Sequence, residues 1–209
     1  MRIQTPMQSE FPGNIPINRL LPDFYRKYNL NEDGGLGEAT VKVEVYKNFR
    51  FYLPNIDARK KAVLKHDIHH IITGYKSDFK GETEIGAWEI ASGCRKYWVA
   101  TVLDLASLAL GCLFNLPGVF RAFIRGRRMK NLYDDTIPDA QAVSMTVDEL
   151  REKLGLNIGQ RTASVKEVLS FIGWGITGAI YSVCSIIVLP AVIVYSIVIA
   201  LKKNGPRTI

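Results

Sequence analysis

The sequence predicts a mainly α protein: a compact helical bundle with a short N-terminal extended or β segment and a C-terminal hydrophobic membrane helix or hairpin. Three observations lead to this prediction. All three histidines of the 209-residue chain lie in residues 66–70, inside a stretch with helix start and stop signals. A second helical stretch with spaced glutamates follows it. Residues 168–201 then form a 34-residue apolar tract without a charge.

The N-terminal part predicts little regular structure. Residues 1–18 contain three prolines and are interpreted as an irregular arm, followed by a short helix over 19–28. Residues 40–46 (TVKVEVY) alternate between apolar and polar side chains, and residues 49–53 (FRFYL) continue the tendency. Alternation with a period of two indicates a strand or a hairpin, which Pro54 ends.

Helix signals dominate from residue 57 onward. Asp57 is the expected N-cap of a helix that ends at Gly74. A second helix is expected from about Glu82. Residues 97–120 are interpreted as one core helix with a lipid-facing side, because Asp104 at their centre and Pro117 near their end make a full membrane span costly. A capping box of Thr146 and Glu149 predicts a later helix.

The uncharged tract predicts membrane attachment. As one straight helix it would be about 51 Å long, well above the roughly 30 Å hydrocarbon core. Either a single tilted span with a kink at Pro190 or a tight hairpin fits the sequence. A hairpin has short legs, but it keeps the flanking basic residues together on the cytoplasmic side. The expected location is a bacterial inner membrane, with the main domain on its cytoplasmic side.

The charge pattern favours lipid over nucleic acid as a partner. The net charge is +7 and the isoelectric point about 9.3, but the basic residues do not alternate with aromatics in long runs. Arg125, Arg127 and Arg128 are candidates for contact with anionic head groups, and a solvated helix face is the equal alternative. The three cysteines are too widely spaced for a metal pair or a disulfide framework, which indicates a reducing compartment.

The histidine cluster predicts a metal site. In a helix, His66 and His70 differ by about 40° around the axis and can reach one point, while Asp67 and His69 flank them. In the following helix, Glu82 and Glu89 share a stripe with Gly86 and Gly93. Two imidazoles with one or two carboxylates suit zinc, or iron and manganese where coordination positions stay open. The alternative is a polar helix face with glycines that serve packing only.

The spacing resembles the H-D-x-x-H-x11-E signature of the coenzyme Q (ubiquinone) biosynthesis protein 4 family. Here the signature is His66, Asp67, His70 and Glu82. Flanking features are also similar over about residues 57–156, including Trp88-Glu89 in the second helix. The resemblance implies that these four residues ligate a divalent metal, with zinc as first choice. It also implies a prenylated aromatic substrate at a membrane, oxidative removal of the ring carboxylate, and association with other enzymes of quinone biosynthesis.

Residues 19–160 are therefore expected to form a helical metal-binding domain, and residues 161–209 a membrane segment. His69, Glu89, Gly86 and Trp88 are expected beside the metal or the substrate. The leading hypothesis is a metalloprotein, a lyase or oxidative decarboxylase, that acts on or presents a prenylated quinone precursor or another isoprenoid. The alternatives are a non-catalytic lipid-binding scaffold with a structural metal, and a metal-dependent lipid hydrolase. Homo-oligomerisation stays open, and no nucleic-acid partner is expected.

Overall fold

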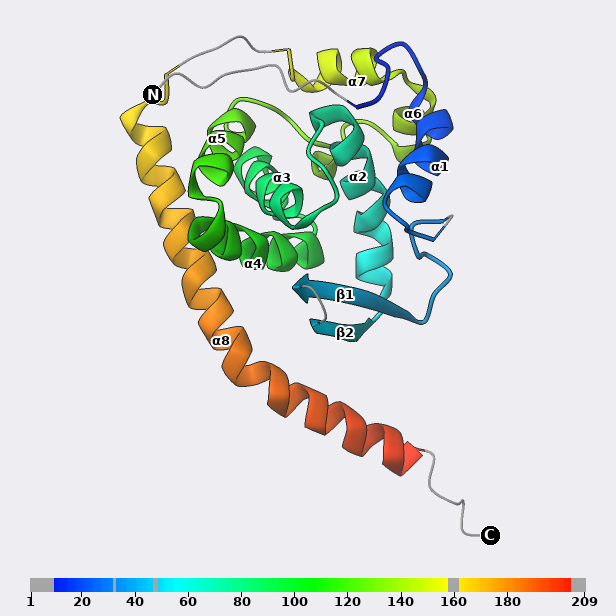
Figure 1. The fold of residues 1–209 in the computed structure, drawn as a ribbon, viewed down its shortest axis with the longest axis vertical. Coiled ribbons are helices and arrows are strands. Elements are labelled where there is room, and N and C mark those ends of the chain that lie inside the picture. The colour runs from blue at the N-terminus through cyan, green and yellow to red at the C-terminus, as the bar shows by residue number, and fades with distance from the viewer. Residues whose placement is uncertain (1–9, 32, 47–48, 158–161, 204–209) are drawn as a thin grey trace.

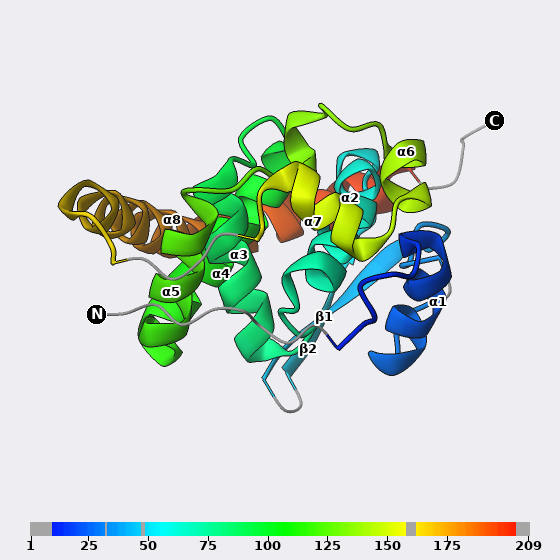
Figure 2. The ribbon, with the colours of Figure 1, turned by 90° about the horizontal axis from the view of Figure 1, so that it is seen from above.

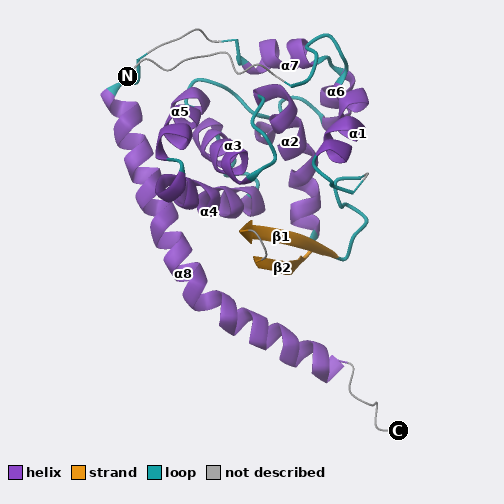
Figure 3. Cartoon of the chain, in the orientation of Figure 1, coloured by secondary structure: helices purple, strands orange, loops and turns teal. Residues whose placement is uncertain are grey.

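The computed structural model confirms a mainly α protein (Figures 1 and 3). It describes residues 10–31, 33–46, 49–157 and 162–203, without the side chains of 41–54 and of most residues after 187. Within these ranges the helices are α1 (Ile17–Lys27), α2 (Asp57–Thr73), α3 (Phe79–Ser92), α4 (Trp98–Phe114), α5 (Leu116–Gly126), the 3-10 helix η1 (Leu132–Asp134), α6 (Asp139–Ser144), α7 (Val147–Leu154) and α8 (Val165–Lys203).

Helix α3 lies at the centre of the bundle, packed against α4 and α5 and beside α2 (Figures 1 and 2). Its apolar side chains are fully enclosed: Ile85 and Trp88 have no exposed surface. Helices α1, α6 and α7 cover the other side of α2. Two neighbouring helices, α2 and α3, therefore bring the histidines and the glutamates into the interior of the domain.

The ends of α2 and α3 differ slightly from the prediction. Gly74 ends α2 with φ 77°, as expected of a left-handed C-terminal glycine. Asp57, however, is the first helical residue, and Ile56 takes the cap position without a side-chain bond. Helix α3 begins at Phe79 instead of about Glu82, because the Asp78 carboxylate accepts a hydrogen bond from the Gly81 N–H at 2.8 Å and caps the helix.

The apolar stretch 97–120, predicted as one helix, is divided in two. The chain breaks at Asn115, whose amide donates a hydrogen bond to Glu84 Oε1 at 3.1 Å on α3. Pro117 then occupies the first turn of α5, where its missing N–H costs nothing. The turn lets α4 and α5 pack on two different sides of α3. Asp104 lies on the inner side of α4 and is 4 % exposed.

The N-terminal elements agree with the prediction in type. Strands β1 (Thr40–Tyr46) and β2 (Phe49–Pro54) form an antiparallel hairpin in which Val43 is paired with Phe51. Helix α1 begins at Ile17, two residues before the predicted helix start at residue 19, and residues 1–9 of the predicted arm lie outside the described residues. The capping box of Thr146 and Glu149 is present, and Gly155 ends α7 with φ 72°.

The C-terminal tract forms one continuous helix, α8, and the alternative of a hairpin is wrong. Its N-terminal half packs against α4 and α5, where Phe171 lies between the rings of Phe120 and Phe123. The remainder runs away from the domain (Figure 1). Of the described helices, α8 alone is long and apolar enough over Val165–Ile187 to cross a membrane, by length and composition.

Candidate metal centre

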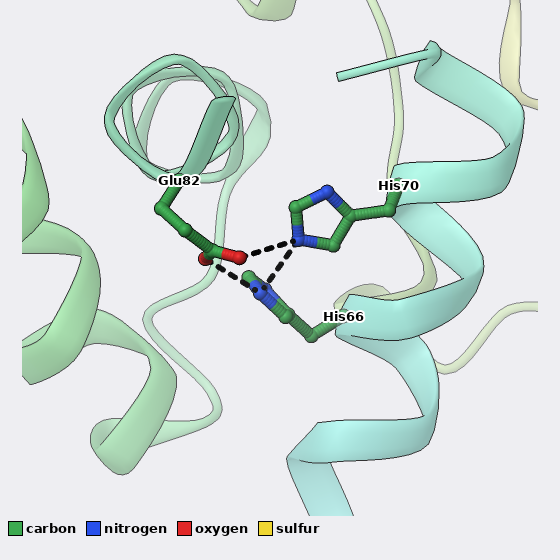
Figure 4. A group of neighbouring side chains, drawn as sticks. All are labelled: His66, His70 and Glu82. Carbon is green, nitrogen blue, oxygen red and sulfur yellow. Dashed lines mark hydrogen bonds and ion pairs between the residues drawn. The ribbon is translucent and has the colours of Figure 1, made fainter. Parts of the chain in front are cut away.

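Three side chains from α2 and α3 converge on one point (Figure 4). The Nε2 atoms of His66 and His70 are 3.1 Å apart. Glu82 Oε2 lies 3.4 Å from His66 Nε2, and Glu82 Oε1 lies 3.3 Å from His70 Nε2. The His70 side chain is 1 % exposed, but those of His66 and Glu82 are 25 % and 38 % exposed. The group is therefore enclosed by protein on the His70 side and open to solvent at Glu82.

Hydrogen bonds on the far edges of both imidazoles aim the Nε2 atoms at this point. His70 Nδ1 lies 2.9 Å from the carbonyl oxygen of Tyr75, which can only accept, so Nδ1 carries the proton. His66 Nδ1 lies 3.1 and 3.2 Å from the two oxygens of Glu89 and is held in the same way. In each neutral ring the Nε2 lone pair then faces the other imidazole. Metal-binding histidines show this arrangement, in which the second nitrogen donates to a carbonyl or a carboxylate.

The spacing of the three donor atoms fits a metal ion. With metal–ligand distances of 2.0–2.1 Å, two ligands of a tetrahedral zinc ion are about 3.3 Å apart. Adjacent ligands of an octahedral ion at similar distances are about 3.0 Å apart. The two Nε2 atoms are 3.1 Å apart, and the two Glu82 oxygens lie 3.3 and 3.4 Å from them, which is close to both values. Two histidines and one carboxylate thus form a group that could hold a metal ion.

In the metal-free site, the pKa values of His66 and Glu82 shift in opposite directions. Burial lowers the pKa of His66, but the carboxylates of Glu89 and Glu82 outweigh it and raise the pKa well above the ordinary value. Burial likewise raises the pKa of Glu82, but His70 and His66 outweigh it and lower the pKa well below the ordinary value. The two carboxylates therefore favour positive charge at this site, and metal binding to His66 competes with its protonation.

His69 lies outside the three-donor group and anchors Glu89. Its Nε2 accepts a hydrogen bond from the Leu132 N–H at 2.9 Å, so the proton is on Nδ1 and is donated to Glu89 Oε1 at 2.6 Å. Both nitrogens of this fully buried ring are occupied. His69 and Glu89, expected beside the metal, thus form a rigid support for His66.

Asp104 is a residue of the site that the sequence analysis did not assign. One of its oxygens, one from Glu89 and a nitrogen of His66 lie within 4.8 Å of one another, so they form a second group with metal-ligand atoms. Burial, and then the charge of Glu89, raise the pKa of Asp104 well above its ordinary value. The sequence could have indicated that Asp104 lies in the site, because a lone carboxylate in an apolar helix has to face a polar interior.

Asp67, a ligand in the predicted set, is not among the three converging donors. Its side chain is directed to Tyr25 and Gly34: a Cβ built on Gly34 would lie 3.0 Å from both Asp67 Oδ2 and the Tyr25 hydroxyl. Asp67 Oδ2 is buried without a hydrogen-bond partner in the described part of the chain. Burial raises the pKa of Asp67 to about 6, although His66 and His70 oppose the shift.

Gly86 and Trp88, expected near the substrate, lie in packed surroundings. A Cβ on Gly86 would meet Ser107 Cβ at 2.9 Å and Asp104 Cα at 3.3 Å, so the glycine lets α4 approach α3 closely. Trp88 is fully buried and donates its indole N–H to Met129 Sδ at 3.4 Å. Both residues fix the helices that carry Glu89 and Asp104.

Replacing Gly86 with alanine should therefore destabilise the domain. The added methyl group has to push α4 away, and overpacking of this kind costs about 1–3 kcal/mol. Gly173→Ala is the matched control, because a Cβ on Gly173 of α8 meets nothing within 4 Å. Thermal unfolding in detergent should show a lower midpoint for Gly86→Ala and an unchanged or raised midpoint for Gly173→Ala. Equal midpoints for both variants would contradict the close α3–α4 contact.

The three arginines predicted at the membrane surface have different surroundings. Arg125 donates to the carbonyl of Thr73 at 3.2 Å and stacks over the ring of Tyr75. Arg128 forms a two-pronged ion pair with Glu167, with both distances 2.6 Å, which ties α5 to the start of α8. Of the three, Arg127 is exposed. Protein contacts thus account for two of the three positive charges.

Comparisons with known proteins identified no relative of this chain. No family model, no curated protein and no solved structure matches the chain. Membership of the coenzyme Q biosynthesis protein 4 family therefore stays a prediction, and what the structure supports is a His66–His70–Glu82 group with the donor atoms of a metal site.

Proposed function

We propose that this chain is a membrane-attached metalloprotein of ubiquinone biosynthesis that acts on a prenylated aromatic precursor. In the proposed reaction the bond between the ring and its carboxylate breaks, carbon dioxide leaves, and water supplies the hydroxyl that replaces it, while an external two-electron oxidant such as dioxygen accepts the electron pair and becomes hydrogen peroxide. The observation that carries the proposal is the convergence of His66 Nε2, His70 Nε2 and Glu82 at separations of 3.1–3.4 Å. The family resemblance of the motif supplies the substrate class.

The number of converging donors favours catalysis over a structural role. Structural zinc sites are closed by four protein ligands, whereas catalytic sites have three protein ligands and keep a position open for water or substrate. Here three donors converge, and the exposed Glu82 marks the open side. A non-catalytic scaffold, the alternative function, would instead require Asp67 to turn from Tyr25 and close the site.

The chain's own residues would hold and orient the reacting groups. His66, His70 and Glu82 would bind a divalent ion, which would supply Lewis acidity for the carboxylate and phenolic oxygens of the ring. Ser77 donates its hydroxyl to Glu82 Oε1 at 2.8 Å and so fixes that carboxylate. Glu89 and the Tyr75 carbonyl keep the imidazoles in place. The isoprenoid tail would stay among apolar side chains or lipid.

Attachment through α8 would keep the domain at the membrane in which such substrates reside. The proposed location is the cytoplasmic face of a bacterial inner membrane, in contact with lipid and with other enzymes of the pathway. Homo-oligomerisation is open.

A complementation experiment tests the proposed function. In a strain that lacks removal of the ring carboxylate, the natural chain should restore ubiquinone, and His70→Ala should leave the carboxylated precursor in the membrane. Lipid extracts analysed by mass spectrometry give both quantities. Lys61→Ala, at an exposed position of α2, should behave as the natural chain. Failure of a metal-loaded natural chain to change the precursor would contradict the enzymatic function while leaving the metal site standing.

A further inference from the structure

Helix α4 exposes an apolar face along its whole length. Trp98 is 59 % exposed, Leu103 46 %, Leu113 77 % and Phe114 71 %. The only charge of the helix, Asp104, points inward and is 4 % exposed. Apolar surface of this extent indicates a partner, because a solvated helix face normally carries polar residues.

The first half of α8 also exposes apolar side chains. Seven of them recur every three or four residues and so share one face: Val165, Leu169, Ile172, Ile176, Ile180, Val183 and Ile187. Ile186 is exposed beside the last of them. Helices α4 and α8 touch where a Cβ on Gly178 would lie 2.8 Å from the Leu105 carbonyl oxygen. We call the exposed sides of this helix pair, α4 with residues 165–187 of α8, the apolar face.

Basic residues stand at the margins of the apolar face. Arg95 and Lys96 are exposed just before Trp98, where Lys96 also pairs with Asp135, and Lys80 is exposed beside Phe79. Lys166 is exposed at the start of α8. Apolar side chains bordered by lysine and arginine are typical of surfaces that lie in the head-group region of anionic membranes. The charge at the margins thus favours lipid over a second copy of this basic chain.

The length of α8 supports the same partner. The α8 residues that pack on the domain extend from Phe171 to Tyr181, so a membrane cannot surround this half of the helix without also enclosing α4. The following tract 183–201 has 19 residues without a charge, or about 28 Å of helix, close to the roughly 30 Å hydrocarbon core. Figure 1 shows this tract leaving the domain on the side where α4 lies, and Figure 2 shows it passing beneath the domain.

We propose that the apolar face is an interfacial membrane-docking surface, seated in an anionic bilayer that residues 183–201 of α8 cross. The inference rests on the membrane attachment in the proposed function and is independent of the metal. It changes the predicted span, because residues 165–182 stay with the domain at the membrane surface and residues 183–201 alone cross the bilayer.

The docking surface would also deliver substrate to the metal centre. Phe79 and Phe114 form an edge-to-face pair with ring centroids 6.0 Å apart at the end of the apolar face. Phe79 is 44 % exposed and lies one helical turn before Glu82. An amphipathic molecule could therefore keep its tail among the lipids at this pair while its polar ring reaches the open side of the metal centre.

Site-specific fluorescence in vesicles tests the docking surface. The full-length chain, with its three cysteines replaced, receives one new cysteine at Leu113 on α4 or, as control, at Glu152 on α7, at the opposite end of the domain (Figure 1). An environment-sensitive label is attached and the protein is reconstituted into phosphatidylcholine–phosphatidylglycerol vesicles. Label at 113 should emit at shorter wavelength, resist aqueous iodide several-fold better than label at 152, and be quenched by lipid-borne quenchers.

Equal iodide quenching at both positions would overturn the proposal. So would cross-linking between labels at 113 without lipid quenching, which would assign the face to a second copy of the chain. If the cysteine-free chain does not fold, quenching of Trp98 by brominated lipids in the natural chain, compared with Trp98→Phe, decides the question. Metal content of the same vesicles reports separately on the metal centre, and failure to enter vesicles at all would contradict the membrane attachment itself.

Discussion

Replacing both His66 and His70 with alanine should reduce the metal content of the purified protein from about one divalent ion per chain to background. The two imidazoles supply two of the three converging donor atoms, and Glu82 alone cannot hold a divalent ion against water. Elemental analysis after dialysis against a weak chelator measures the loss. Lys61→Ala, at an exposed position of the same helix, is the matched control and should keep its metal.

Stability gives a second measure of the same site. A ligand present at a thousand times its dissociation constant stabilises the folded state by about 4 kcal/mol. Added zinc should therefore raise the unfolding temperature of the natural chain and of Lys61→Ala, and leave that of the double variant nearly unchanged. Equal metal content in the double variant and the natural chain would rule out the centre at His66 and His70.

The sequence predicted the part of the site that one helix determines. His66 and His70 are one turn apart, so the period of the helix alone brings their rings to one point. The approach of Glu82 to the two histidines depends on the loop between the two helices, so helical periodicity does not predict it. The family motif predicted Glu82 as the third ligand. The structure supports that placement: Gly74 ends α2, and Asp78 caps α3 so that Glu82 falls in its first turn.

The contributions of distant elements were not predictable in the same way. Asp104 enters the site from α4 because Gly86 lets α4 approach α3 closely, and no periodicity of α2 or α3 encodes that contact. The Tyr75 carbonyl that orients His70 is a main-chain group, so no residue type in the sequence indicates this contact. The break at Asn115 depends on its bond to Glu84 of another helix.

Asp67 shows the limit of reasoning from a motif. Its place next to His66 in the signature makes it a predicted ligand, yet adjacent helical residues point about 100° apart. In this structure its carboxylate is directed to Tyr25 of α1, which packs over α2. The hairpin alternative for the tail fails for a simpler reason. Neither glycine nor a charged turn interrupts residues 179–201, and Pro190 is accommodated within α8.

Comparing substitutions of Glu82 and Glu89 is the sharpest test of which glutamate binds the metal and which one supports His66. Glu82→Ala should lose metal and activity together, because the two Glu82 oxygens lie 3.3 Å from His70 Nε2 and 3.4 Å from His66 Nε2. Its side chain is 38 % exposed, so loss of its ion pairs with the two imidazoles should lower the unfolding temperature of the metal-free chain, but less than loss of the buried Glu89 does. Elemental analysis and thermal unfolding in the presence of chelator measure the two effects.

Glu89→Ala should have the opposite profile. Its carboxylate has no exposed surface and receives the Nδ1 protons of His69 and His66, so removal leaves buried donors unpaired and should cost about 3–5 kcal/mol. The three donors of the metal site remain, and loss of the carboxylate behind His66 should weaken metal affinity by about 10–100-fold without abolishing binding. Glu89→Gln, which keeps an acceptor for His69, should recover most of the stability.

If Glu89→Ala bound no metal while Glu82→Ala stayed fully loaded, Glu89 would be the ligand, and the centre would lie in the second group, with His66 and Asp104.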